Sequence, residues 1–356
     1  MAVWFLVFVP LAIGIEFLTP ERHLLVFLFA SLAILPLAAW MGRATEQLAS
    51  RLGEGVGGLL NATFGNAAEL IIALTALRAG LHDVVMASIV GSIVGNILLV
   101  LGAAMLAGGL RHNVQHYNPA GARSHSVMLT LAAIALVIPA AFHVASGKSG
   151  EGLITLSVSI SVVLLIVYGL FLVFSLVTHA SLFQGSSEEN TEPSHEAEWS
   201  LRNSVLVLAG VTVMIAWISE IMVGAIEPAA HQLGLSRVFV GVFIVAILGN
   251  AAEHSTAITS AMKNRMDLAL AIAVGSSVQV ALFVAPVLVI ASLFMGPMPM
   301  PLVMSAGLVL MVLLSVLITG QVAGDGRSDW LRGVQLLAIY IVFAITYYFL
   351  PAVQSQ

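Results

Sequence analysis

The chain has 356 residues, of which 60% are hydrophobic and only 9% are charged, and its mean hydropathy is +1.05. Ordinary soluble domains carry about 25% charged residues, so this composition indicates an integral membrane protein. The net charge of −5 offers no basic face for nucleic acid, and the absence of cysteine from the sequence excludes disulfides and thiolate metal sites.

Membrane-crossing helices need about 20 apolar residues each, and the chain contains about eleven such segments. The first lacks a basic leading region and a small-residue cleavage site, so we expect it to be retained. The fold class predicted is therefore an all-α integral membrane protein. The expected spans are Val3–Leu18, His23–Trp40, Val56–Leu77, a fourth ending near Leu106, Ser126–Phe142, Leu153–Leu176, Leu201–Val223, Phe239–Met262, Leu268–Leu293, Leu302–Ile318 and Leu331–Leu350.

One pentapeptide occurs twice, each time inside an apolar span. The first motif is Gly65-Asn66-Ala67-Ala68-Glu69 and the second is Gly249-Asn250-Ala251-Ala252-Glu253. An ionisable side chain near the middle of a membrane costs at least ~2.5 to 3.5 kcal/mol and usually marks an ion or proton path. A protonated carboxyl that only ties helices together is the alternative, but the repetition favours the ion path.

The motif belongs to a longer internal duplication. Shifting the chain by 184 residues lays Gly65 on Gly249 and also lays Gly91-Ser92 on Gly275-Ser276 without a gap. Each copy has five expected spans, an odd number, so the second copy must enter the membrane from the opposite side. We therefore expect an extra helix at 1–20, a five-helix repeat at 21–180, an acidic linker at 181–200 and an inverted five-helix repeat at 201–356.

Polar residues in the spans that follow the two motifs complete the candidate site. Ser92 and Asn96 lie one turn apart in the first copy, and Ser276 and Gln279 take similar positions in the second. Helix lengths place Glu69 and Asn96 at similar depths, near the membrane midplane. These amides and hydroxyls are expected to line the path of the ion.

Loop charges predict the orientation of the chain. Cytosolic loops of membrane proteins are enriched in lysine and arginine, and nine basic residues fall on the amino-terminal side against four on the other. The amino terminus and the linker, with its glutamates between 188 and 198, should be cytosolic, and the carboxyl terminus outside. The composition of the linker predicts a solvent-exposed segment, and an acidic segment that senses cations is the alternative.

Inverted repeats with glycine-interrupted helices are typical of secondary transporters. Gly65 and Gly249 are the expected helix breaks, which would expose carbonyl oxygens to a cavity. Two carboxylates with neutral oxygens suit a hard cation such as Ca²⁺, and a buried carboxyl pair also holds protons. Since neither motif span contains a basic counter-ion, cation and proton should alternate there, as in an antiporter.

These residues resemble the calcium/proton exchangers of the cation/calcium exchanger superfamily over nearly the whole chain after the first span. The resemblance rests on both motifs, on His254, on Gly91-Ser92-Ile93 with Asn96, and on Gly275-Ser276-Ser277 with Gln279 and Pro286. It implies that Glu69 and Glu253 bind cation and protons, that Asn66, Asn250, Asn96 and Gln279 line the path, and that the second and seventh spans move as gates. Ala68 departs from the threonine or valine more usual in the family, which puts in doubt a hydroxyl role at that position.

Three alternatives stay open at this level. A sodium/calcium exchanger is disfavoured because Asn96 and Gln279 are neutral, and a channel would not need an opposing proton gradient. An intramembrane enzyme using Glu253 and His254 lacks a second histidine at metal-ligand spacing; His254 itself is either a proton relay or a structural imidazole.

No enzymatic activity and no cofactor are expected. Ca²⁺ and protons are the expected cargo, in contact with lipid in a bacterial inner membrane, with the oligomeric state open.

Overall fold

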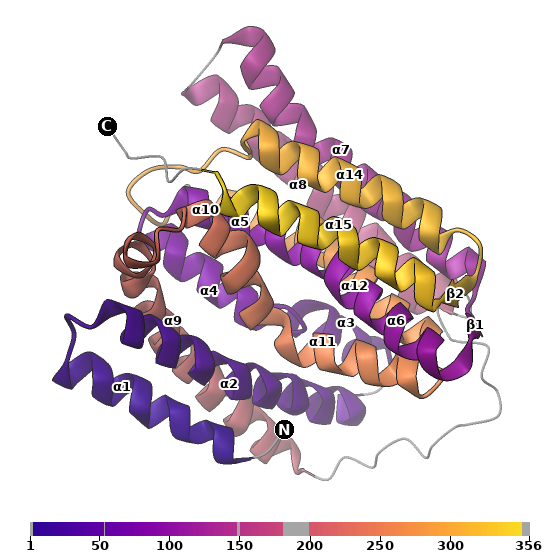
Figure 1. The fold of residues 1–356 in the computed structure, drawn as a ribbon, viewed down its shortest axis with the longest axis horizontal. Coiled ribbons are helices and arrows are strands. Elements are labelled where there is room, and N and C mark those ends of the chain that lie inside the picture. The colour runs from indigo at the N-terminus through magenta and orange to yellow at the C-terminus, as the bar shows by residue number, and fades with distance from the viewer. Residues whose placement is uncertain (1–2, 53, 148–149, 181–198, 351–356) are drawn as a thin grey trace. The chain divides into compact units, whose positions relative to one another are not determined.

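The computed structural model describes residues 3–52, 54–147, 150–180 and 199–350. These residues are almost entirely helical (Figure 1). Of the linker expected at 181–200, only Trp199 and Ser200 fall within the described part of the chain. The helices form two compact units, and each unit draws on both of the expected repeats.

The first unit is built around two long helices. Helix α2 lies along α9, α1 packs against α2, and α4 packs against α9 (Figure 1). Buried residues of α2 recur every three or four positions, which gives the continuous apolar stripe that such packing needs. The unit comprises η1 (Val3–Val7), α1 (Phe8–Leu18), α2 (His23–Leu52), α3 (Glu54–Phe64), α4 (Ala67–Arg78), α5 (His82–Val94) as far as Ser88, α9 (Leu201–Leu233), α10 (Arg237–Phe239), η5 (Val240–Val245), α11 (Ala246–Met262) as far as Ala252, and the end of α15 (Trp330–Tyr348) from Thr346.

The second unit contains the remaining helices. In it α7 packs against α14 and α12, and α8 packs against α13. It comprises the rest of α5 and α11 with η2 (Gly95–Val100), α6 (Leu101–His112), β1 (Val114–His116), α7 (Pro119–Ser146), α8 (Glu151–Val173), η3 (Phe174–Thr178), α12 (Met266–Gln279), η6 (Val280–Val284), α13 (Ala285–Ala291), α14 (Ala306–Ala323), β2 (Arg327–Asp329) and most of α15 (Trp330–Tyr348).

One short sheet departs from the all-α expectation. Strands β1 and β2 pair antiparallel, with Gln115 opposite Ser328. The Gln115 side chain donates to the carbonyl of Ala261 at 2.8 Å and to Oδ1 of Asn264 at 3.0 Å, so the sheet also holds the end of α11. The sequence does not predict the strands because each is only three residues long, too short to show an apolar alternation.

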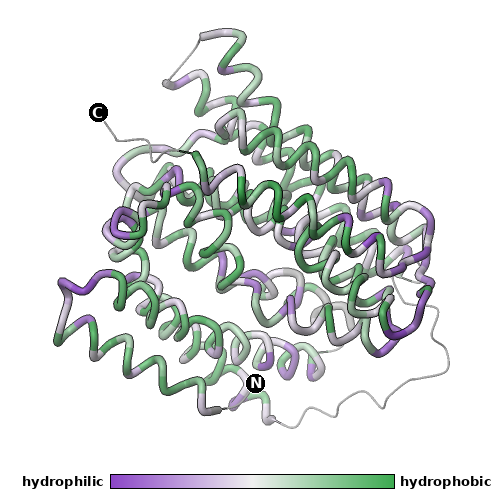
Figure 2. Tube along the Cα trace, in the orientation of Figure 1, coloured by the Kyte–Doolittle hydropathy of each residue, from purple (hydrophilic) through white to green (hydrophobic). Residues whose placement is uncertain are grey.

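Nine helical segments in the described part of the chain are long and apolar enough to cross a membrane. The two other expected spans are the shorter apolar helix Trp4–Leu18 and the pair α3 and α4, which is divided at the first motif. Most helices are hydrophobic along their length, and hydrophilic residues gather at helix ends and around β1 and β2 (Figure 2). Helices α2 and α9 run past the expected ends of their spans. They contain 30 and 33 residues, and at about 1.5 Å per residue both are longer than the ~30 Å of hydrocarbon.

Several helices are irregular next to the candidate residues. Segments η2, η5 and η6 are π-helical, a geometry that is rare and often found at functional sites. Adding 184 to the bounds of η2 gives 279–284, which overlaps η6 (Val280–Val284). The irregularity therefore recurs at the position that the sequence duplication predicts.

Candidate ion-binding site

The first motif interrupts its helix. Helix α3 ends at Phe64 and α4 begins at Ala67, with Gly65 and Asn66 between them. Asn66 has a non-helical backbone, with φ −100° and ψ 24°, and its side chain is buried. Glu69 therefore lies in the first turn of α4, where the helix dipole favours negative charge.

Within the first unit the Glu69 side chain is held by the second motif. Asn250 Nδ2 donates to Glu69 Oε1 and also to the carbonyl of Ala246, at 3.1 Å, one turn earlier in α11. A carbonyl oxygen only accepts, so the bond to Ala246 fixes which end of the amide is the nitrogen. Asn250 thus presents an N–H to Glu69, a contact that both the ionised and the protonated acid can accept.

The predicted helix break at Gly249 is wrong. Helix α11 runs without interruption from Ala246 to Met262, and the irregular stretch, η5, ends before it. A Cβ atom at position 249 would lie 2.5 Å from Cγ of Glu69. Glycine at this position allows close approach of a side chain to the helix backbone, which is its second common use beside breaking helices.

The second unit contains a chain of hydrogen bonds that ends at the other acid. His254 Nε2 lies 3.1 Å from Asn96 Oδ1, and Asn96 Nδ2 donates to Ser276 Oγ at 3.2 Å. Because Asn96 donates through its nitrogen, its oxygen accepts, and His254 carries its proton on Nε2. Ser276 also hydrogen-bonds the Glu253 side chain, which leaves its hydroxyl proton directed at the carboxyl group.

The two other candidate residues of the second unit, Ser92 and Gln279, are also buried. Ser277, which was not predicted as a site residue, donates to the carbonyl of Ile93 at 3.3 Å. Residues 93 and 277 are separated by 184 positions, the offset of the duplication, so matching residues of the two copies meet where these helices cross.

The structure thus divides the candidate residues into two sets. Glu69, Gly249 and Asn250 come together in the first unit, and Glu253, His254, Asn96 and Ser276 in the second. Among the described residues, no group of three or more His, Asp or Glu side chains is arranged to hold a metal ion. Within its own unit, Glu69 accepts from the amide of Asn250 and Glu253 is hydrogen-bonded by the hydroxyl of Ser276, so each acid has a neutral partner.

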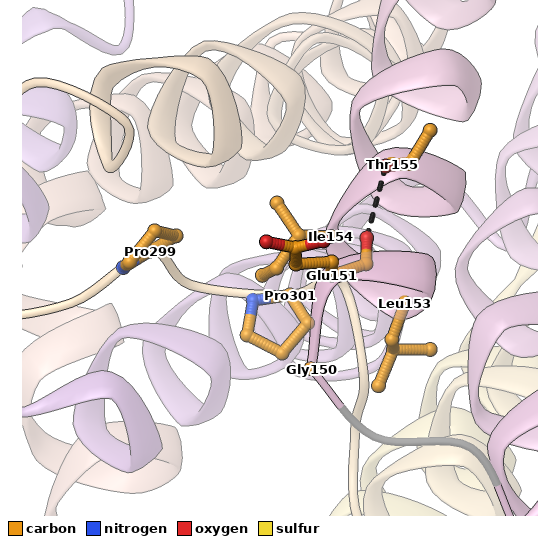
Figure 3. Close-up of a pocket in the computed structure, with 7 residues that line it drawn as sticks. All are labelled: Gly150, Glu151, Leu153, Ile154, Thr155, Pro299 and Pro301. Carbon is orange, nitrogen blue, oxygen red and sulfur yellow. Dashed lines mark hydrogen bonds between the residues drawn. The ribbon is translucent and has the colours of Figure 1, made fainter.

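A separate cavity of about 530 Å³ lies at the start of α8 and contains none of these residues (Figure 3). Its lining is mostly apolar, and Glu151 contributes its only carboxyl group. Thr155 donates to the backbone carbonyl of Glu151 at 2.9 Å, an ordinary contact within the helix. The lining consists of Gly150, Glu151, Leu153, Ile154, Thr155, Pro299 and Pro301.

Nine long apolar helical segments in the described part of the chain, with half-buried acids beside the division between α3 and α4 and inside α11, define a multi-pass membrane protein. Residues 22–177 and 203–349 match the family described as sodium/calcium exchanger protein. The chain belongs to this family, and the match covers both expected repeats.

Individual relatives are similar over nearly the full chain. A protein of Aphanothece halophytica named Ca²⁺/H⁺ antiporter is 48% identical over 340 residues, which are 92% of this chain and 91% of that protein. The Bacillus subtilis Ca²⁺/H⁺ antiporter ChaA is 46% identical over 318 residues, 89% of this chain and 90% of its own. The solved structure of native YfkE matches with a TM-score of 0.83 at 40% identity, covering 97% of this chain and 100% of that one.

Proposed function

We propose that this protein is a secondary antiporter that moves Ca²⁺ out of the cytosol in exchange for protons. The observation that carries the proposal is the duplicated acid: Glu69 and Glu253 each lie half-buried on an apolar helix, and each is contacted by a neutral hydrogen-bonding group in its own unit. The names of relatives at 46 to 48% identity support the same cargo.

In the proposed cycle the two carboxyl groups carry protons in one state and one Ca²⁺ in the other. Carboxylates, amide oxygens and hydroxyls are the ligands that Ca²⁺ prefers, and Asn66, Asn250, Asn96, Gln279, Ser92 and Ser276 supply the neutral ones. With no lysine or arginine in either motif span, two empty carboxylates would remain without a fixed counter-ion, a costly state in a membrane. Return without cargo is therefore disfavoured, and exchange is coupled.

Alternating access is proposed to use α2 and α9, the helices at the positions of the family's gating spans. They pack against each other along much of their lengths in the first unit, which suits movement as one body. Two protons for one Ca²⁺ moves no net charge, so one pH unit supplies ~2.7 kcal/mol, enough for about a hundredfold Ca²⁺ gradient.

Purified protein in liposomes tests this function. Vesicles with an acidic lumen should accumulate Ca²⁺ from an alkaline bath, and reversing the pH gradient should reverse the flux. In a sodium/calcium exchanger, Ca²⁺ flux would instead follow an imposed sodium gradient at uniform pH. In a channel, Ca²⁺ would flow down its own gradient without a sodium or a pH gradient. Flux that follows sodium and ignores pH would overturn the proposal.

The orientation proposed from the loop charges places the amino terminus in the cytosol and the carboxyl terminus outside a bacterial inner membrane. Nine basic residues against four support this assignment. A tag after Gln356 should react with an impermeant reagent on intact cells, whereas a tag at Asn190 should react only after the cells are opened. Equal reactivity of the two tags on intact cells would contradict the inverted-repeat arrangement.

A further inference from the structure

We propose that Gly249 is a positioning residue for Glu69: its missing side chain gives the acid its place beside Asn250 and so sets the affinity for Ca²⁺. The part of this inference that concerns Ca²⁺ rests on the proposed function. The part that concerns the side-chain position stands on the contacts in the first unit alone.

Backbone conformation does not explain a glycine at position 249. The residue lies inside a continuous α-helix, where alanine is the better residue by intrinsic propensity. It is not among the glycines whose φ is positive. Space is the remaining reason, because a Cβ atom there would lie 2.5 Å from Glu69 Cγ and 3.6 Å from both Cβ and Cδ of that residue.

With any side chain at position 249, either the backbone of α11 or the side chain of Glu69 must move to relieve the clash. The helix backbone of α11 cannot move by itself, since its hydrogen bonds hold it, so the Glu69 side chain must rotate away. Asn250 cannot follow, because its amide also donates to the Ala246 carbonyl at 3.1 Å. Rotation therefore separates Glu69 Oε1 from the N–H that it accepts.

Gly169 provides a matched control. It also lies inside a regular helix, α8, and a Cβ atom there would meet nothing within 4 Å outside its own helix. Gly169→Ala therefore reports only the general effect of alanine in a membrane helix, which should raise the melting temperature slightly or leave it unchanged.

The test is a double-mutant cycle on the purified protein, with the melting temperature as the first readout. Gly249→Ala should lower the melting temperature when Glu69 is present, and should lose that effect in a Glu69→Ala background, where no Cγ atom remains to clash. In liposomes Gly249→Ala should raise the KM for Ca²⁺ on the order of tenfold or more, with a smaller change in maximal rate. Gly169→Ala should shift the melting temperature equally in both backgrounds.

An equal shift for Gly249→Ala in the two backgrounds would overturn the proposal. If Gly249→Ala fails to accumulate in the membrane, the Glu69→Ala, Gly249→Ala double variant should accumulate normally, because the clash is then absent. Failure of the double variant to accumulate would count against the proposal. If the cycle shows coupling while the wild-type protein carries Ca²⁺ flux that ignores the pH gradient, the positioning role holds and the proposed function is the part that fails.

Discussion

Glu69→Gln and Glu253→Gln are each expected to insert normally and to reduce proton-coupled Ca²⁺ transport by at least ~100-fold, the effect of losing a charged ligand to a divalent ion. Glutamine keeps the size of a protonated carboxyl and can accept the hydrogen bond that Asn250 donates to Glu69. It removes the negative charge and the releasable proton. If the acids only tied helices together, both substitutions would be nearly neutral.

A graded series separates these possibilities further. Aspartate at either position keeps the charge but falls one methylene short, so Glu69→Asp and Glu253→Asp should give intermediate rates. Asn96→Ala and Gln279→Ala should weaken transport less than the glutamine variants, since neutral oxygens contribute less to a divalent ion than a carboxylate does. Initial Ca²⁺ and proton fluxes in liposomes, normalised to inserted protein, are the measurement. Wild-type exchange in either glutamine variant would end the proposal.

Acidification should weaken Ca²⁺ binding steeply. Metal ligands must be deprotonated, so protons compete with the ion for the same oxygens. Where both carboxyls are protonated in the Ca²⁺-free protein, each unit of pH decrease should raise the apparent Kd for Ca²⁺ about a hundredfold, because two protons leave per ion bound. At a pH where both are already ionised, the apparent Kd should no longer change.

The control for this pH dependence is a variant with one titrating acid. In Glu69→Gln or Glu253→Gln, any residual Ca²⁺ binding should change by about tenfold per pH unit, since only one proton remains to be displaced. Equilibrium binding of radioactive Ca²⁺ to detergent-purified protein across a pH series gives both slopes. A flat wild-type curve in the range where the protein remains folded would contradict competition at these residues.

The two glycines show what the duplication predicts and what it does not. The sequence treats Gly65 and Gly249 as equivalent, and the first lies between two helices while the second lies inside one. Glycine permits both outcomes, because it tolerates unusual backbone angles and also leaves space. Local sequence cannot choose between them, since the choice depends on Glu69, a residue 180 positions away along the chain.

The contacts of the polar candidate residues also depend on residues that are distant in the sequence. Burial of Asn96, Ser276 and Gln279 could be predicted from their place in apolar spans. The pairing of Asn96 with Ser276 and His254 could not, because it depends on the register in which distant helices cross. The division into two compact units, each with parts of both repeats, is likewise a property of packing, whereas the repeat itself is a property of sequence.

The central claim is that the carboxyl groups that hold protons are also the ones that bind Ca²⁺. Counting the protons released when Ca²⁺ binds tests this claim most directly, with a pH indicator in weakly buffered, purified protein. At a pH where both acids are protonated, the account predicts release of about two protons per Ca²⁺ in the wild type and about one at most in Glu69→Gln or Glu253→Gln. Ca²⁺ binding without proton release, or the same release in wild type and variants, would contradict it.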